Sequence, residues 1–344
     1  MEDDLTRTLR SEPMLWDLFT RKEEYDPGGR DEHGRFLHTA SKHGDPVEPR
    51  VSEFLFGKGF RPEHPDGKSF AVFLSHDVDL LKPMSLSWLR LPRIGKKVLK
   101  SVSRKFRTAW AFDDTLRLEE RYGAHSTFFL MALEKGDEEF DYRLSELSEE
   151  TSMILDKGFE VGLHGGLSAF RDKVALATEK ERMEKILGRK VVGFRNHYLK
   201  IEVPLTWHLL SEAGFAYDST LGYAETIGFR NGMCHPFRPF DLNTNEYVDI
   251  LEIPLGLMDG SIYSYMKLDS AGGWERTRPM IDRVAECGGV LTVLWHNTYM
   301  AGDPLAFYER LLKYCAGKGG WFASGAEIAK WWAESGLARM GATR

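Results

Sequence analysis

From residue 69 onward, short runs rich in β-branched and aromatic residues alternate with stretches that have the pattern of helices or loops. No other feature of the sequence limits the possible folds as strongly. The runs expected to form strands are residues 70–74, 126–130, 159–163, 190–194, 215–218, 248–253 and 290–295. Strands that alternate with helices at this spacing form a mostly parallel sheet, open or closed into a barrel. In either case the chemistry belongs at the carboxyl ends of the strands.

Helices are expected between several of these runs, at residues 143–157, 174–187 and 274–286. A last helix has a clear start signal, because Ser324 is followed three residues later by Glu327, ahead of an apolar run. This spacing predicts a capping box, in which each side chain bonds the backbone N–H of the other residue.

Residues 1–68 lack this alternation and are expected to form an N-terminal extension packed on the larger domain. A short helix is predicted near Met14–Phe19, followed by a long irregular segment rich in Gly, Pro, Asp, Glu and His. Residues 69–334 are expected to form one domain, with a C-terminal tail at 335–344.

The overall composition excludes several classes of protein. A formal charge of −6 gives no reason to expect nucleic-acid binding, and 42% hydrophobic residues are too many for a disordered chain. Three scattered cysteines, Cys234, Cys287 and Cys315, do not make a disulfide framework, and their odd number favours a reducing compartment, although one bridge could form. There is no signal-peptide pattern and no run of about 18 apolar residues, so we expect a cytoplasmic protein.

Two carboxylates follow the first expected strand, in the segment Ser75-His76-Asp77-Val78-Asp79. Side chains of an extended segment alternate between its faces, so Asp77 and Asp79 point the same way. Their repulsion favours a bound cation or a shared proton. A solvated acidic turn explains the pair equally well when it is considered alone.

Three further strand ends carry polar side chains. His164 follows the third expected strand, Arg195 and His197 share a face after the fourth, and His296 follows the run 290–295. A lone histidine in such a place is more often structural than catalytic, and an inward arginine needs an anionic partner.

Taken together, these strand ends carry the side chains that are usual in a hydrolytic metal centre. A set of two histidines and one carboxylate also holds non-haem iron, so the ligand types alone leave the chemistry open.

The order and spacing of these segments resemble the polysaccharide deacetylase family (carbohydrate esterase family four) over roughly residues 69–334. Four segments carry the resemblance: Ser75-His76-Asp77-Val78-Asp79, Val161-Gly162-Leu163-His164-Gly165-Gly166-Leu167-Ser168, Gly193-Phe194-Arg195-Asn196-His197-Tyr198 and Leu294-Trp295-His296. The resemblance implies a distorted (β/α)7 barrel and metal-dependent hydrolysis of an N-acetyl group on an amino sugar.

The resemblance also implies a catalytic role for four residues. Asp77 would be the general base that deprotonates the attacking water, and Arg195 would orient Asp77. The backbone N–H of Tyr198 would help to form the oxyanion hole, and His296 would be the general acid that protonates the leaving amine.

The metal site implied by the resemblance is incomplete. Asp79 and His164 match two ligands, with Asp79 in an Asp-x-Asp variant of the first motif. Ser168 stands where the family has its second histidine, and His197 stands where the family has proline. Our hypothesis is that His197 replaces the missing ligand of a divalent metal. We expect this metal to be Zn²⁺, with Co²⁺ or Mn²⁺ as alternatives. The competing hypothesis is a metal-poor site against which His197 merely packs.

The sequence offers three candidates for the carboxylate that tunes the pKa of the catalytic histidine: Asp249, Glu252 and Asp259. Alternation does not choose among them, and we favour Asp259 because it lies beyond the strand in a loop. His125 and His235 are expected to be structural.

A basic insertion at residues 83–111 contains eight Lys and Arg residues and no acidic residue. It follows the first strand and therefore lies on the rim of the expected site. Three interpretations stay open: a helix with an ordinary solvated face, a lid over an anionic substrate such as a nucleotide- or lipid-linked sugar, and a helix on an acidic membrane surface.

The leading function is therefore a metal-dependent deacetylase acting on an intracellular amino-sugar precursor of surface-polysaccharide biosynthesis. One alternative is hydrolysis of another C–N bond, such as a cyclic amide. Another is a non-catalytic carbohydrate-binding or scaffold protein. The presence of Ser168 in a ligand position favours this alternative, whereas the presence of Asp77, Arg195 and His296 together argues against it.

Overall fold

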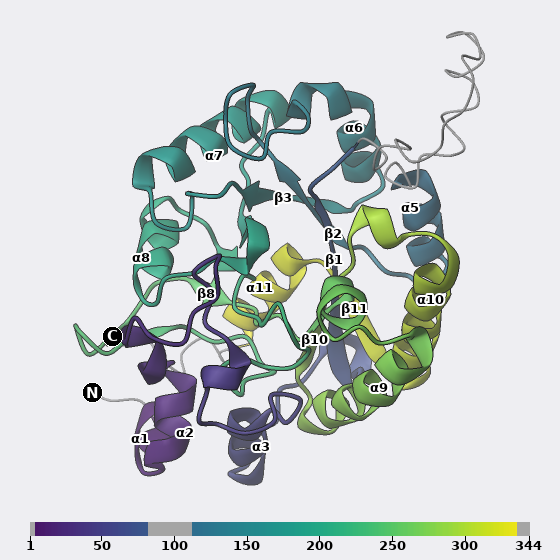
Figure 1. Cartoon of the computed structure of the whole chain (residues 1–344). Helices are drawn as coiled ribbons and strands as arrows, with labels where there is room; N and C mark the ends of the chain where they lie inside the picture. Colours follow the sequence, from purple (N-terminus) through teal and green to yellow (C-terminus); the bar gives the residue numbers. More distant parts are fainter. Residues whose placement is uncertain (1–3, 82–111, 336–344) are drawn as a thin grey trace, which may run out of the picture.

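Figure 1 shows the computed structural model of the chain, which describes residues 4–81 and 112–335. The basic insertion 83–111 lies outside the described residues, as does the tail after residue 335, and the interpretations of the insertion therefore stay predictions. Within the described residues, no helix combines the length and the apolar character needed to cross a membrane.

A curled, parallel sheet forms the centre of the molecule. Its strands follow the order β8-β5-β4-β3-β2-β1-β10-β9, and β11 pairs with the first half of β1. Their bounds are β1 (Phe70–Val78), β2 (Thr127–Met131), β3 (Glu160–Gly165), β4 (Gly193–Asn196), β5 (Tyr217–Asp218), β8 (Leu251–Glu252), β9 (Leu257–Met258), β10 (Val290–Leu294) and β11 (Gly320–Ala323). The end strands β8 and β9 are not paired with each other among the described residues, so the barrel is incomplete. This confirms the predicted distorted α/β barrel.

Helices surround the sheet, as the view into the barrel in Figure 1 shows. They are α5 (Phe112–Glu120), α6 (Ser148–Asp156), α7 (Lys173–Leu187), α8 (Leu205–Glu212), α9 (Ser270–Cys287) and α10 (Gly302–Gly317). Residues of the strands that face the helices are apolar and buried, as expected for a parallel sheet covered on its outer face.

The last helix, α11 (Gly325–Glu334), closes the end of the barrel at which the strands begin. The backbone N–H of Gly325 donates to Thr127 Oγ1, and that of Ala326 donates to Glu160 Oε2, the first residues of β2 and β3. The predicted capping box is present, with both of its hydrogen bonds formed between Ser324 and Glu327. Because α11 covers this end, the opposite end is the one left for a site.

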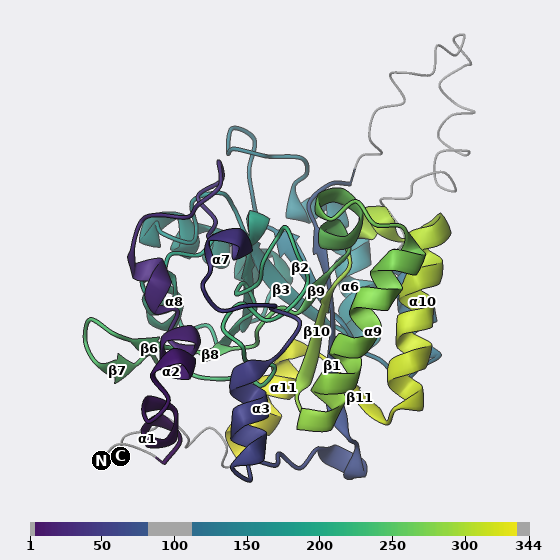
Figure 2. The same cartoon turned by 60° about the horizontal axis from the view of Figure 1, so that its bottom comes forward.

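The N-terminal extension contains α1 (Asp4–Arg10), α2 (Pro13–Phe19) and α3 (Arg50–Gly57), which lie beside the barrel between α8 and α9 (Figures 1 and 2). The prediction of a long irregular segment after the first short helix was therefore wrong for α3, in which Val51 and Leu55 are buried. A two-stranded hairpin of β6 (Phe240–Asp241) and β7 (Glu246–Tyr247) was also not predicted.

A buried ion-pair network anchors the extension. Glu24 accepts hydrogen bonds from Arg21 Nε at 2.7 Å and from Arg230 Nε at 2.8 Å, and all three side chains are buried. Burial alone would raise the pKa of Glu24, but the two guanidinium groups outweigh it and lower that pKa to about 2. Because both partners are needed to satisfy this buried carboxylate, the network joins residues 21–24 firmly to the loop that contains Arg230.

Candidate metal centre and catalytic site

The polar residues predicted from the sequence meet at the carboxyl ends of the strands. Asp79 follows β1, His164 lies in β3, His197 follows β4, and His296 follows β10. They line a pocket of about 310 Å³. Its other walls are formed by Arg35, Asp77, Tyr198, Leu199, Ala224, Met258, Gly260, Ser264, Tyr265, Leu294, Thr298 and Tyr299.

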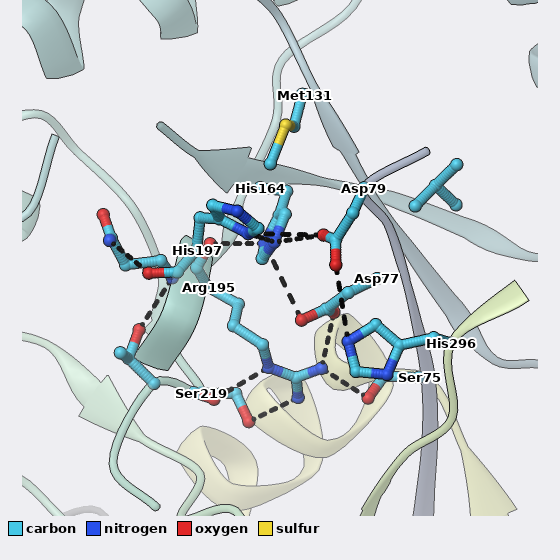
Figure 3. A network of polar contacts seen from close by, with 12 residues as sticks. Ser75, Asp77, Asp79, Met131, His164, Arg195, His197, Ser219 and His296 are labelled. Carbon is cyan, nitrogen blue, oxygen red and sulfur yellow. Dashed lines mark hydrogen bonds and ion pairs between the residues drawn. The ribbon is translucent and has the colours of Figure 1, made fainter. Parts of the chain in front are cut away.

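Asp79, His164 and His197 point toward one another (Figure 3). His164 Nε2 lies 3.0 Å from Asp79 Oδ1, His197 Nδ1 lies 3.4 Å from the same oxygen, and the two nitrogens are 3.2 Å apart. Ligands about 2.0–2.1 Å from a tetrahedral Zn²⁺ lie about 3.3–3.4 Å from one another. The three atoms therefore have nearly the spacing of one face of a tetrahedral site.

The buried oxygen of Asp79 supports the same conclusion. Asp79 Oδ1 is shielded from solvent, yet it accepts no hydrogen bond from the described residues, despite the two nitrogens near it. A buried carboxylate oxygen normally has a hydrogen-bond donor or a cation as partner. Burial alone would raise the pKa of Asp79, but its contacts with His164 and His197 outweigh burial and hold that pKa well below its usual value. The group thus has the donor types and spacing to bind a divalent metal.

The tautomer of His164 is fixed by the backbone. Its Nδ1 lies 3.0 Å from the carbonyl oxygen of Arg195, which can only accept a hydrogen bond. Nδ1 therefore carries a proton, which leaves Nε2, on the side of Asp79 and His197, as the nitrogen available to a metal. This is the arrangement expected of a histidine that binds a metal.

Ser168 does not reach this cluster. It is exposed in the turn between β3 and α7, and it is not part of the pocket wall. The structure therefore brings His197, and not Ser168, next to Asp79 and His164.

Asp77 and Arg195 form a buried ion pair beside the cluster. Arg195 Nη1 donates to Asp77 Oδ1 at 2.9 Å and to Ser75 Oγ at 2.7 Å, while Nε donates to the carbonyl oxygen of Ser219 at 2.9 Å. The guanidinium group also lies over the ring of Phe129, 4.5 Å from its centre. Held on several sides, Arg195 keeps the Asp77 carboxylate next to the ligand cluster (Figure 3).

His296 faces the cluster from β10 and is paired with Asp259. Its Nδ1 lies 2.6 Å from Asp259 Oδ1, and its Nε2 lies 3.6 Å from Asp79 Oδ2. Burial would lower the pKa of His296, but the carboxylates, Asp259 above all, raise it to about 10. The pairing with Asp259 thus favours the protonated imidazole, whose Nε2 lies on the side of Asp79.

The other two carboxylates considered for this role lie elsewhere. Asp249 is exposed and pairs with Arg238, whereas Glu252 is buried and accepts a hydrogen bond from Trp207 Nε1. Among the three, Asp259 is the one in contact with His296.

The remaining histidines and the cysteines are outside the pocket. His125 packs its ring against the edge of Phe159, and buried His235 bonds Ser52 Oγ and lies 3.2 Å from the carbonyl oxygen of Cys287. Cys234, Cys287 and Cys315 are buried as free thiols.

Tyr198 adopts a left-handed backbone conformation, with φ of 58°, immediately after His197. Its ring stacks on that of His33, with centroids 4.9 Å apart. Such a conformation is uncommon for a bulky residue and frequent at functional sites. Its predicted part in an oxyanion hole stays a prediction.

Sequence reasoning missed Arg35, which lines the pocket, and Glu139, which contacts two of the lining residues. Arg35 belongs to the N-terminal extension. Its Nε donates to Asp31 Oδ2 at 2.7 Å, and its Nη2 donates to the Tyr265 hydroxyl at 3.1 Å. Glu139, in the loop after β2, lies beside His197 and Tyr198. Neither residue directly follows a strand, and a search for polar residues at strand ends therefore does not find them.

No family model and no curated protein matches the sequence. The fold is similar to that of a protein named as a polysaccharide deacetylase from Mycobacterium smegmatis, with a TM-score of 0.59 and 21% identity over 83% of this chain and 97% of the other. It is similar to Puue allantoinase, with a TM-score of 0.57 and 15% identity over 85% and 95% of the two chains. It is also similar to a protein named as a polysaccharide deacetylase from Pseudomonas aeruginosa PAO1, with a TM-score of 0.56 and 16% identity over 85% and 96%. These likenesses confirm the fold that the sequence resemblance implied.

Proposed function

We propose that the protein is a metal-dependent deacetylase that hydrolyses the N-acetyl group of an amino sugar. One observation carries the proposal. Three potential ligand atoms lie 3.0–3.4 Å apart, with a base candidate and an acid candidate beside them. A base, an orienting arginine and a protonated histidine have no use together in a site that only binds a sugar.

Each side chain has a separate task in this proposal. Asp79, His164 and His197 would hold a divalent metal, Zn²⁺ first, which when bound polarises the acetyl carbonyl and lowers the pKa of a water molecule. Asp77, oriented by Arg195, takes the proton of the attacking water. His296, kept protonated by Asp259, gives a proton to the leaving amine. A base and an acid positioned in this way each contribute about 10²–10⁴-fold to the rate.

We further propose that the substrate is anionic, in keeping with a nucleotide- or lipid-linked sugar of surface-polysaccharide biosynthesis. Arg35 supports this proposal, because its buried guanidinium group lines the pocket. Asp31 and Tyr265 occupy its Nε and Nη2, whereas Nη1 has among the described residues only the carbonyl of Tyr198, at 3.4 Å. Nη1 carries two N–H donors, so one of them is left for a carboxylate or phosphate oxygen in the pocket.

Hydrolysis of a cyclic amide is the second candidate, and the fold shared with an allantoinase favours it. The same base, acid and metal would serve, since both reactions add water to an amide carbonyl. The two candidates differ in product: a deacetylase releases acetate, whereas opening of a cyclic amide does not.

A substrate panel tests the proposal. Metal-loaded protein is incubated with N-acetylated sugars, their nucleotide-linked forms and cyclic amides, and acetate and ring opening are measured separately. Acetate release that falls at least about 10²-fold in Asp77→Asn and in His296→Gln supports the deacetylase. Ring opening without acetate release would instead support hydrolysis of a cyclic amide. Binding of a sugar without turnover would instead support a non-catalytic protein.

A further inference from the structure

His197 offers one ring nitrogen to the ligand cluster and turns the other away from it. Its Nδ1 is 3.2 Å from His164 Nε2 and 3.4 Å from Asp79 Oδ1, whereas its Nε2 lies 3.8 Å from Glu139 Oε2. The side chain of His197 is only 8% exposed. Glu139 is the carboxylate that faces this nitrogen.

A neutral imidazole that binds a metal through one nitrogen carries a proton on the other, and that proton needs an acceptor. The first histidine of the cluster has such an acceptor, because His164 Nδ1 donates to the carbonyl oxygen of Arg195. If His197 binds through Nδ1, the described residue in a position to accept from Nε2 is Glu139. The two atoms are 3.8 Å apart, which is an ion-pair distance. A small rotation of the ring or the carboxylate would bring them within hydrogen-bond distance.

We propose that Glu139 is a positioning residue for the metal centre, which holds His197 with Nδ1 toward the metal and increases the basicity of that nitrogen. The inference rests on the proposed metal centre and extends it to a residue outside the strand-end motifs. Outer carboxylates of this kind orient metal-binding histidines, and their loss typically weakens metal binding by about 10–100-fold.

The backbone of the loop provides a second, independent observation. Glu139 has a φ of 62°, in the left-handed region that glutamate rarely adopts. Its side chain is 45% exposed, so burial in the core does not account for that conformation. The carboxylate instead meets the site, since the Tyr198 hydroxyl lies 3.4 Å from both of its oxygens. Such backbone strain is typical of residues that the surrounding structure holds for a functional reason.

The test measures metal affinity, and it does not depend on knowing the substrate. Glu139→Gln removes the charge while keeping the size of the side chain, and Glu138→Gln removes the same charge from the neighbouring, exposed position. The dissociation constant for Co²⁺ is measured for both variants and for the unaltered protein by titration, with the Co²⁺ absorption spectrum as a report of the ligand geometry. Thermal unfolding of the metal-free proteins checks that all three have the same fold.

We expect Glu139→Gln to bind Co²⁺ about 10–100-fold more weakly, with an altered spectrum, and Glu138→Gln to match the unaltered protein. Equal affinity in Glu139→Gln and the unaltered protein would overturn the role of Glu139 while leaving the metal centre in place. Equal weakening in both variants would also overturn it, because a general effect of charge would then explain the loss. Failure of the unaltered protein to bind Co²⁺ would overturn the proposed metal centre itself.

Discussion

His197 determines whether the ligand set of the proposed metal centre is complete. It occupies the place of a third ligand, while Ser168 is exposed in a turn and does not line the pocket. Because a tetrahedral catalytic site needs three protein ligands, we expect His197→Ala to lose bound metal and Ser168→Ala to keep it. Metal content of the purified variants measures both, and the opposite pattern would refute the relocated ligand.

Asp259 sets the protonation of the proposed general acid. The pKa of His296 is raised to about 10, so the imidazole stays protonated at neutral pH and loses its proton only under alkaline conditions. Removing the carboxylate charge in Asp259→Asn lowers that pKa. The alkaline limb of kcat/KM for acetate release should therefore move to lower pH, by at least about one unit. An alkaline limb that stays in place would show that Asp259 does not tune the acid.

Much of the site could be predicted from the sequence, because its residues follow strands of one parallel sheet. The carboxyl ends of such strands meet in space, so Asp77, Asp79, His164 and His296 could be placed together before the structure was known. Arg35 and Glu139 could not, since they belong to an extension and a loop whose position depends on tertiary packing.

The strands also divide into those that could be predicted from the sequence and those that could not. Each of the seven predicted runs overlaps an observed strand, although β5 and β8 have only two residues each. The strands β9 and β11 were not predicted. Both depend on their neighbours β10 and β1 for pairing, and local composition gives little sign of that.

The capping box of α11 should contribute measurably to stability. Ser324 bonds the backbone N–H of Glu327, which would otherwise lack a partner at the start of the helix. We expect Ser324→Ala to lower the free energy of unfolding by about 1 kcal/mol without changing metal content. Denaturant unfolding measures the change, with Ser168→Ala as the matched control at an exposed position. An unfolding free energy equal to that of the control would contradict the assigned cap.

Charge across the chain as a whole is uneven, because a protein of net −6 contains a segment with eight basic residues and no acidic one. The lid interpretation of residues 83–111 predicts that changing Lys96, Lys97 and Lys100 to Glu raises KM for an anionic substrate and leaves KM for its neutral counterpart unchanged. Equal effects on both substrates would remove that interpretation. Binding of the unaltered protein to anionic vesicles tests the membrane interpretation separately. The cytoplasmic location likewise stays a prediction.

The most direct test of the metal centre is the metal content of the protein purified without chelators, measured by mass spectrometry beside Asp79→Ala. We predict close to one equivalent of a divalent metal, Zn²⁺ first, in the unaltered protein and its loss in the variant. Asp79 is the informative residue, because its buried oxygen lies within 3.4 Å of both histidine nitrogens. Absence of metal from both proteins, even after incubation with Zn²⁺, Co²⁺ or Mn²⁺, would contradict a metal-dependent hydrolase and favour a carbohydrate-binding or scaffold protein on the same barrel.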